Sequence, residues 1–275
     1  MFLFECLARF QDLYHVRREA CHWWWHQFPP ARSLQPSDYV STEEATPENI
    51  CAIRRLLYKA SVKRHREKAP GQRELPYLFG QKRIRYLEKT VANCFHLDFL
   101  HHCFPDAQYI FLIRDPRPNI SSMMEGWPLI ERFGQPHMTT FVRETPGSTV
   151  PHWSYAAPPG WRQMLTRPLV QICAWSWRQH IEIALEFFQR AVQPVMVLRY
   201  EELTNNPLDV IRQVVEKVDL KLTDRVIEHA TARPLSSTTV SQPSQDKWTE
   251  HREQIATIEP LIRETAHKIG YDPRK

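Results

Sequence analysis

Three short runs of apolar residues predict buried β-strands. They are "IRYLEK" at 84–89, "QYIFLIR" at 108–114 and "VMVLRY" at 195–200. Turn residues follow each run, and then come segments with the spacing of amphipathic helices. Strands that alternate with helices pair in parallel through crossover connections, so the pattern predicts an α/β fold. We expect three layers, with a central parallel sheet and helices covering both of its faces.

The helices have recognisable starts and ends. The segment 46–68 begins with a threonine, a proline and a glutamate, which favour a helix N-terminus, and its isoleucines and leucines then recur on one face. The last helix is closed by Gly270, a residue type that often ends helices. Helical patterns are also predicted for 207–218 and 223–230.

The length and composition indicate one soluble domain over residues 1–275. The 275 residues are 42% hydrophobic, which is sufficient for a substantial core. Between Pro128 and Pro168 the chain is rich in prolines and aromatic residues and is too long for an ordinary connection. We expect this segment to be a lid or an acceptor-binding insertion.

Charge and cysteine content narrow the possible partners and the compartment. A formal charge of +5 favours an anionic ligand, but the basic residues form no long run, so nucleic acid is not expected as a partner. The six cysteines are far apart, as in reduced intracellular proteins. No apolar stretch is long enough to cross a bilayer, and the start lacks a signal peptide, so we expect a cytoplasmic protein without a membrane partner.

The segment "YIFLIRDPRPNISSMM" at 109–124 joins a strand to a helix start and is typical of a site for a phosphate or a similar anion. Arg114 ends the strand and Ser122 follows eight residues later, about two helical turns along, so both can face one anion. A structural interpretation is equally compatible with this stretch. In that interpretation Arg114 pairs with a neighbouring carboxylate and a serine caps the helix.

A second segment, 195–220, joins a strand to "RYEEL" and a proline-started helix. Together the two ordered motifs resemble the sulfotransferase family, enzymes that use 3′-phosphoadenosine 5′-phosphosulfate (PAPS). The resemblance covers most of 84–127 and 195–271, weakly the N-terminal third and hardly 128–168. It implies a P-loop-NTPase-like fold. It also implies sulfuryl transfer from PAPS to a hydroxyl or amine of a small-molecule or peptide acceptor, without a metal.

The resemblance assigns nucleotide-binding roles to residues that match the family motifs. Arg114 and Ser122 would bind the 3′-phosphate, and Tyr200 would lie beside the nucleotide. Lys247 would reach a phosphate, and Ser237 is the candidate among the hydroxyl-bearing residues of 236–241. The alternatives are that Tyr200 belongs to the core and that Lys247 is a solvated surface lysine.

The same resemblance suggests catalytic residues. Lys89 matches the family lysine that stabilises the bridging oxygen, where charge develops on the leaving phosphate, although it could also be a surface lysine. The acceptor must lose a proton, so a base is required. Glu19 is the preferred base and His22 the second choice, while an ion pair of Glu19 with Arg17 or Arg18 is the structural alternative.

Cysteines and histidines do not indicate a metal centre. His22 and His26 stand at helical spacing beside Cys21, and "HHC" occupies 101–103. Neither group has the ligand set or the spacing of a metal finger, and sulfuryl transfer needs no metal. We therefore expect no metal site.

One family element has no match in the sequence. The family binds the 5′-phosphosulfate with a loop resembling "PRSGTT", whereas the first glycine here is Gly71, in a linker. Residues 1–20 resemble the helix that follows such a loop, so we expect an N-terminally truncated domain that begins upstream of Met1. The alternative to an active enzyme is a non-catalytic, degenerate family member that keeps half of a nucleotide site.

Overall fold

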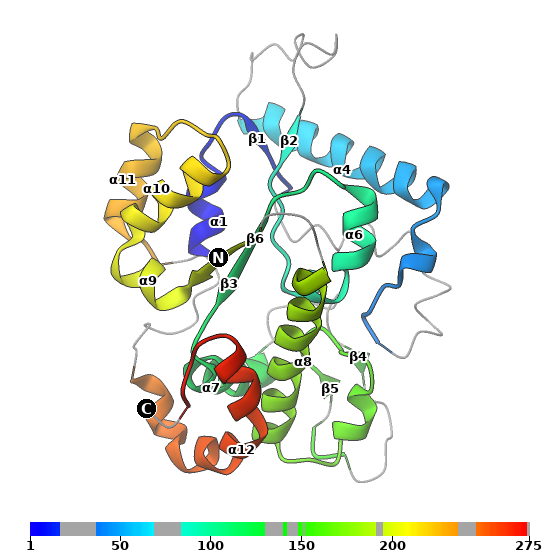
Figure 1. Ribbon diagram of the computed structural model, residues 1–275, viewed down its shortest axis with the longest axis vertical. Coiled ribbons are helices and arrows are strands. Elements are labelled where there is room, and N and C mark those ends of the chain that lie inside the picture. The colour runs from blue at the N-terminus through cyan, green and yellow to red at the C-terminus, as the bar shows by residue number, and fades with distance from the viewer. Residues whose placement is uncertain are drawn as a thin grey trace.

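The molecule is an α/β structure built around short parallel strands (Figure 1). The computed structural model describes residues 1–16, 37–68, 84–129, 140–141, 148–150, 152–190, 195–235 and 246–273.

Helices make up most of the described chain. The α-helices are α1 (Phe2–Leu7), α4 (Pro47–Lys68), α6 (Leu97–Cys103), α7 (Pro116–Gly126), α8 (Leu169–Arg190), α9 (Tyr200–Asn205), α10 (Pro207–Lys217), α11 (Asp224–Ala232) and α12 (Arg252–Lys268). Short 3₁₀-helices are η2 (Thr42–Glu44), η3 (Val91–Phe95), η4 (Trp127–Leu129), η5 (Trp161–Met164) and η6 (Lys247–His251). Within the described ranges, none of the helices has both the length and the apolar character that a bilayer crossing requires.

The strands form parallel pairs, as predicted. β1 (Leu13–Tyr14) pairs with β2 (Arg85–Tyr86), and β3 (Tyr109–Ile113) pairs over its whole length with β6 (Val195–Arg199). The strands predicted at 108–114 and 195–200 are thus confirmed to within a residue at each end. In the part of the chain that the structure describes, the two pairs are separate sheets rather than one.

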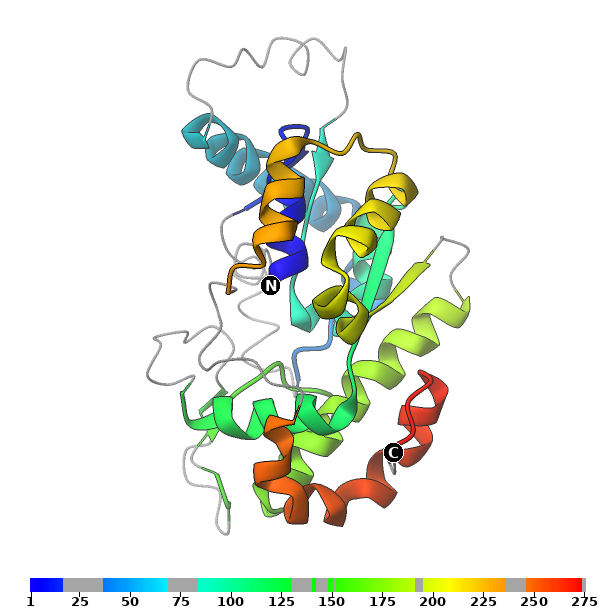
Figure 2. The same cartoon turned by 90° about the vertical axis from the view of Figure 1, so that its left-hand side faces the viewer.

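The β3–β6 pair lies between two layers of helices (Figure 2). On one face Phe111 and Ile113 pack in a core cluster with residues of α7, α8 and α12. On the other face Ile110 and Leu198 pack with residues of α1, α10 and α11. Alternate residues of a strand point to opposite faces, so one face of β3 is buried through Phe111 and Ile113, while on the other face Ile110 is half-buried and Leu112 is exposed.

Residues 1–16 differ from the single helix that the resemblance implies for 1–20. α1 ends at Leu7, and β1 begins six residues later, at Leu13. The reason is visible in the burial of residues 13–16, four consecutive side chains that are all buried. A helix on the surface of a core cannot bury four neighbours in a row, whereas a strand covered on both faces can. α1 begins at Phe2 without a side-chain cap, in agreement with the sequence.

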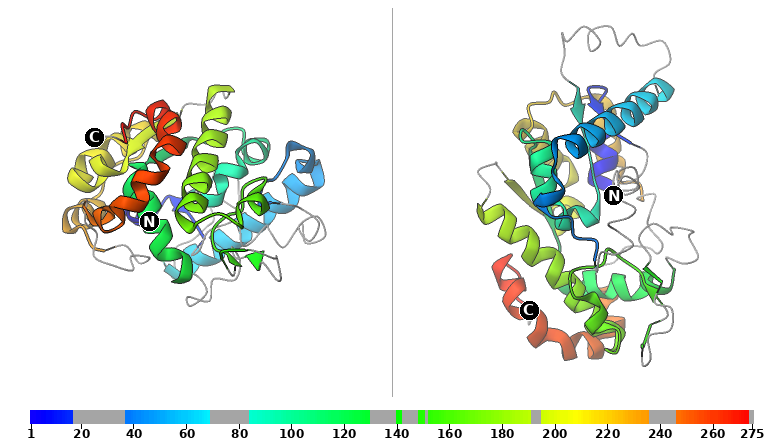
Figure 3. Two further views of the ribbon diagram at one scale, coloured as in Figure 1. Left: turned by 90° about the horizontal axis from the view of Figure 1, so that it is seen from below. Right: turned by 90° about the vertical axis from the view of Figure 1, so that its right-hand side faces the viewer.

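The strand predicted at 84–89 is reduced to Arg85 and Tyr86. Beyond it, the Glu88 carboxylate accepts hydrogen bonds from the Thr90 hydroxyl at 2.5 Å and from the Asn93 amide. These bonds turn the chain into η3, and the strand stops. α4 packs against β1 and covers this part of the molecule (Figure 3, right).

The described part of 128–168 contributes to the core. β4 (Thr140–Phe141) and β5 (His152–Trp153) form an antiparallel pair. Trp153, Trp161 and Leu165 are almost completely buried, in the same cluster as α7 and α8. These residues anchor the segment that the sequence predicts as a lid or acceptor-binding insertion.

A buried histidine makes stability depend on pH. His180 on α8 donates from Nδ1 to the Ser176 carbonyl oxygen at 2.8 Å and packs on Phe95, and its burial lowers its pKa from 6.5 to about 4. The unfolded chain binds this proton more readily, so stability should fall as the pH drops from about 6.5 to 4.

We expect this single group to cost at most about 3 kcal/mol of unfolding free energy over that range. Urea unfolding at pH 7 and pH 4 should show the loss in the native chain and a smaller loss in His180→Gln, which keeps a side-chain donor. Equal losses in the two proteins would contradict the assignment.

Candidate functional site

The turn between β3 and α7 is held by its own side chains. Asp115 is the N-cap of α7, and its Oδ1 accepts the Arg117 backbone N–H at 2.9 Å. The Arg117 guanidinium pairs with the same carboxylate through contacts of 3.1 and 2.6 Å. These hydrogen bonds raise the pKa of Arg117. The Asp115 carboxylate is therefore already occupied by the helix cap and by the Arg117 guanidinium.

The start of α7 has no backbone amide left for a ligand. Pro116 and Pro118 have no N–H, and the Arg117 N–H is bound by Asp115. The next amide, Asn119, donates to the Asp115 carbonyl oxygen at 3.2 Å. A helix N-terminus usually binds anions through its first free amides. An anion at this turn must instead be held by side chains.

Arg114 is the basic side chain best placed for that purpose. Its guanidinium lies 4.6 Å from the ring centre of Tyr200, the first residue of α9. Among the described residues no carboxylate pairs with Arg114. The hypothesis that Arg114 is a structural arginine paired with a neighbouring carboxylate therefore finds no support here. A guanidinium stacked on an aromatic ring keeps its N–H groups available for a planar or tetrahedral anion.

Tyr200 and Arg114 lie at the same edge of the β3–β6 sheet. Like Arg114, Tyr200 follows directly on the carboxyl end of its strand, and β3 and β6 run in parallel. The carboxyl ends of neighbouring parallel strands meet at one edge of the sheet, where α/β proteins place ligands. The structure thus brings together two residues that the sequence separates widely.

The two consecutive serines of α7 differ in burial. Ser121 is buried, whereas Ser122 is exposed. Ser122 lies roughly 9 Å along the helix axis from Pro116. Its side chain is open to solvent on the outer surface of α7.

The next turn of α7 contacts Lys247. Glu125 forms an ion pair with Lys247 of η6, and its other oxygen lies 3.9 Å from His251. The Arg117 guanidinium lies 4.9 Å from the ring centre of Trp248. The structure thus places Lys247 against the helix that carries Ser122, in an ion pair rather than free in solvent.

Lys89 stands in the sequence between Glu88 and Thr90, whose side chains are hydrogen-bonded to each other. It is half-buried and follows β2 by three residues. The bond between its neighbours holds this loop in one conformation, which restricts the lysine backbone. The catalytic role of Lys89 stays a prediction.

Three predicted site residues, Glu19, His22 and Ser237, lie outside the described residues. Where the chain is described, no cluster of three or more histidine, cysteine, aspartate or glutamate side chains is arranged to hold a metal ion.

A family profile described as the sulfotransferase family matches residues 3–166. This match covers more than half of the chain. The chain belongs to the sulfotransferase family. The matched range includes Lys89, Arg114 and Ser122, whereas Tyr200 and Lys247 lie beyond it.

Solved structures of sulfotransferases resemble this family member weakly. Sulfotransferase STF9 from Mycobacterium avium is 17% identical, with a TM-score of 0.45, over 68% of this chain and 42% of that one. The sulfotransferase domain from the curacin biosynthetic pathway is 13% identical, with a TM-score of 0.43, over 92% of both chains. The chain thus spans less than half of the first of these proteins. No curated protein sequence matches it.

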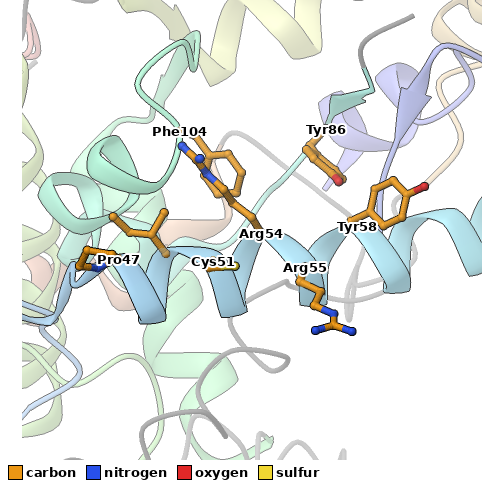
Figure 4. Close-up of a pocket in the computed structure, with 8 residues that line it drawn as sticks. Pro47, Cys51, Arg54, Arg55, Tyr58, Tyr86 and Phe104 are labelled. Carbon is orange, nitrogen blue, oxygen red and sulfur yellow. The ribbon is translucent and has the colours of Figure 1, made fainter. Parts of the chain in front are cut away.

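The sulfotransferase-family chain also has a surface groove beside α4 (Figure 4). The groove has a volume of about 650 Å³, with Tyr86 and Phe104 facing Arg54 and Tyr58 of the helix. Phe104 precedes β3 and Arg114 follows it, so a strand roughly 17 Å long separates them. The groove is therefore distinct from the turn that carries Arg114.

Sequence reasoning missed the side chains that organise this turn. Glu201 accepts the Asp115 N–H at 3.0 Å, and Tyr271 donates its hydroxyl to the same carboxylate at 2.5 Å. Glu201 stands in the "RYEEL" segment, directly after Tyr200, so the motif contained the signal. Nothing in the local pattern around Tyr271 connects it to a residue 70 positions earlier.

Proposed function

We propose that this chain is a sulfotransferase that uses PAPS and transfers its sulfuryl group to a hydroxyl or amine acceptor. The observation that carries the proposal is Arg114, a guanidinium oriented by Tyr200 at the carboxyl end of a parallel strand, with no carboxylate partner among the described residues. Such a group fits the 3′-phosphate that distinguishes PAPS from common adenine nucleotides. The membership of the sulfotransferase family supports the same donor.

The positions of the described side chains support the proposed nucleotide-binding roles. Arg114 contributes charge-assisted hydrogen bonds to the 3′-phosphate, and Tyr200 keeps the guanidinium in position. Ser122 adds a hydroxyl from the exposed side of α7. Lys247 adds positive charge near the same helix, although a phosphate must compete with Glu125 for it.

The transfer step assigns tasks to the remaining residues. PAPS, when bound, supplies the sulfuryl group, whose bond to the 5′-phosphate oxygen breaks as a new bond forms to the acceptor. Lys89 stabilises the negative charge that remains on that oxygen. Glu19, or His22 as the second choice, takes the proton that the acceptor loses. The acceptor is a small molecule or a peptide.

The proposal is tested by incubating the purified chain with PAPS and a panel of alcohols, phenols, amines and tyrosine peptides. We expect release of adenosine 3′,5′-bisphosphate that increases with one acceptor class and appears with an equal amount of sulfated product. Nucleotide binding with no release to any acceptor or to water would contradict catalysis. It would favour a non-catalytic, nucleotide-binding family member.

A further inference from the structure

Three consecutive residues where β6 ends and α9 begins contact three different parts of the candidate anion site. The ring of Tyr200 lies against the Arg114 guanidinium. Arg199 and Glu201, on either side of it, contact the C-terminal residues that follow α12. α12, which leads into these C-terminal residues, packs against α7 and α8 (Figure 1).

Glu201 uses both of its carboxylate oxygens. Oε1 accepts the backbone N–H of Asp115 at 3.0 Å, and Oε2 accepts the hydroxyl of Tyr271 at 2.5 Å. A carboxylate that receives two donors has little freedom to rotate. Because Asp115 follows Arg114 directly, this bond fixes the backbone from which the Arg114 side chain extends.

Tyr271 is itself held by Arg199. The Arg199 guanidinium lies 4.5 Å from the ring centre of Tyr271, and Nη2 donates to the Gly270 carbonyl oxygen at 3.0 Å. Gly270 has a φ of +78°, and a Cβ there would approach Arg199 Nη2 to 2.5 Å. The positive φ favours a glycine at this position, and any side chain there would also displace the Arg199 guanidinium.

The hydrogen bond from Tyr271 to Glu201 remains in place over a wide pH range. Burial, and then the bond to the Glu201 carboxylate, raises the pKa of the Tyr271 phenol. The phenol therefore keeps its proton and acts as the donor. The contact links the last described turn of the chain to the turn at Arg114.

We infer that Glu201 is a positioning residue for Arg114 and that Tyr271, from the C-terminal end, holds Glu201 in its working orientation. This inference rests on the proposed function, in which Arg114 binds the 3′-phosphate of the nucleotide. Glu201 and Tyr271 act through the backbone of Asp115, and neither is expected to touch the nucleotide. The C-terminal residues thereby set the affinity of a site formed by β3, α7 and α9.

The first test is hydrogen exchange at the turn, which needs no ligand. Between Arg114 and Pro118 two residues are prolines, so exchange in this segment reports on few amides. Glu201→Ala should accelerate exchange at Asp115 without changing exchange in α8, and Tyr271→Phe should do so to a smaller extent. Glu201→Gln keeps an acceptor oxygen and should preserve most of the protection. Glu202→Ala, an exposed neighbour on the same helix, is the matched control.

The second test is calorimetric titration with adenosine 3′,5′-bisphosphate and with adenosine 5′-monophosphate, which lacks the 3′-phosphate. Glu201→Ala should weaken the bisphosphate about tenfold, the loss of one well-made hydrogen bond, and leave the monophosphate unchanged. Glu202→Ala should leave both affinities within about twofold, because no hydrogen bond is lost.

The outcomes separate the inference from the function on which it rests. Unchanged exchange at Asp115 in Glu201→Ala overturns the positioning role, whatever the titrations show. Faster exchange together with a native chain that binds the two nucleotides equally overturns the proposed function and, with it, the link to Arg114. If Glu201→Ala does not fold, Tyr271→Phe, which removes only a hydroxyl, carries the same comparison.

Discussion

Replacing Glu19 by glutamine should lower turnover by about 10²- to 10⁴-fold while leaving nucleotide affinity nearly unchanged. The reason is that a glutamine amide cannot accept the proton that a hydroxyl or amine loses when it attacks sulfur. The measurement is the initial rate of product formation at saturating PAPS, combined with the dissociation constant for adenosine 3′,5′-bisphosphate. A base acts on the acceptor, so the rate should fall and the dissociation constant should stay within about twofold.

His22 provides the internal comparison for this assignment. The variant His22→Ala should keep most of the turnover if Glu19 is the base. Intact turnover in Glu19→Gln, together with lost turnover in His22→Ala, would transfer the role of base to His22. A loss of nucleotide affinity in Glu19→Gln equal to the loss of rate would instead place Glu19 in the nucleotide site.

Replacing Arg114 by alanine should weaken binding of adenosine 3′,5′-bisphosphate by about 2 to 3 kcal/mol, or about 30- to 150-fold. The variant removes the charge-assisted hydrogen bonds to the 3′-phosphate. Arg114→Lys should recover only part of the affinity, because a lysine lacks the planar guanidinium that lies on Tyr200. Titration of the three proteins at one salt concentration measures both effects.

Arg212→Ala is the matched control for overall charge. Arg212 is exposed on α10, where it pairs with Asp209 of the same helix. Its removal lowers the net charge by the same amount as Arg114→Ala but takes nothing from the turn. If Arg212→Ala weakened the bisphosphate as much as Arg114→Ala does, binding would depend on general charge and not on the 3′-phosphate contact.

The strands that position the site were readable from the sequence because their apolar runs are continuous. Phe111 and Ile113 face one helical layer and Ile110 faces the other, so apolar residues are needed on both faces of β3. The structure of the start of the chain was harder to predict. The resemblance implies a helix over its first 20 residues, whereas the burial of residues 13–16 and the pairing of Leu13 and Tyr14 with β2 select a strand there.

Individual residues of the candidate site could be predicted from the sequence, but the contacts between them could not. Arg114 and Ser122 follow from one local motif and Tyr200 from another, but the stacking of Arg114 on Tyr200 depends on the parallel pairing of β3 with β6. The loss of free amides at the start of α7 needs the side-chain conformation of Asp115. The bond from Tyr271 to Glu201 joins segments that no local pattern relates.

The most direct test is a calorimetric comparison of adenosine 3′,5′-bisphosphate with adenosine 5′-monophosphate on the unmodified chain, at equal pH and ionic strength. If Arg114 binds a 3′-phosphate, the bisphosphate should bind at least about 30-fold more tightly, the value of a charge-assisted contact. That preference should disappear in Arg114→Ala. Equal affinities for the two nucleotides, or no binding of either, would contradict a PAPS site at this turn.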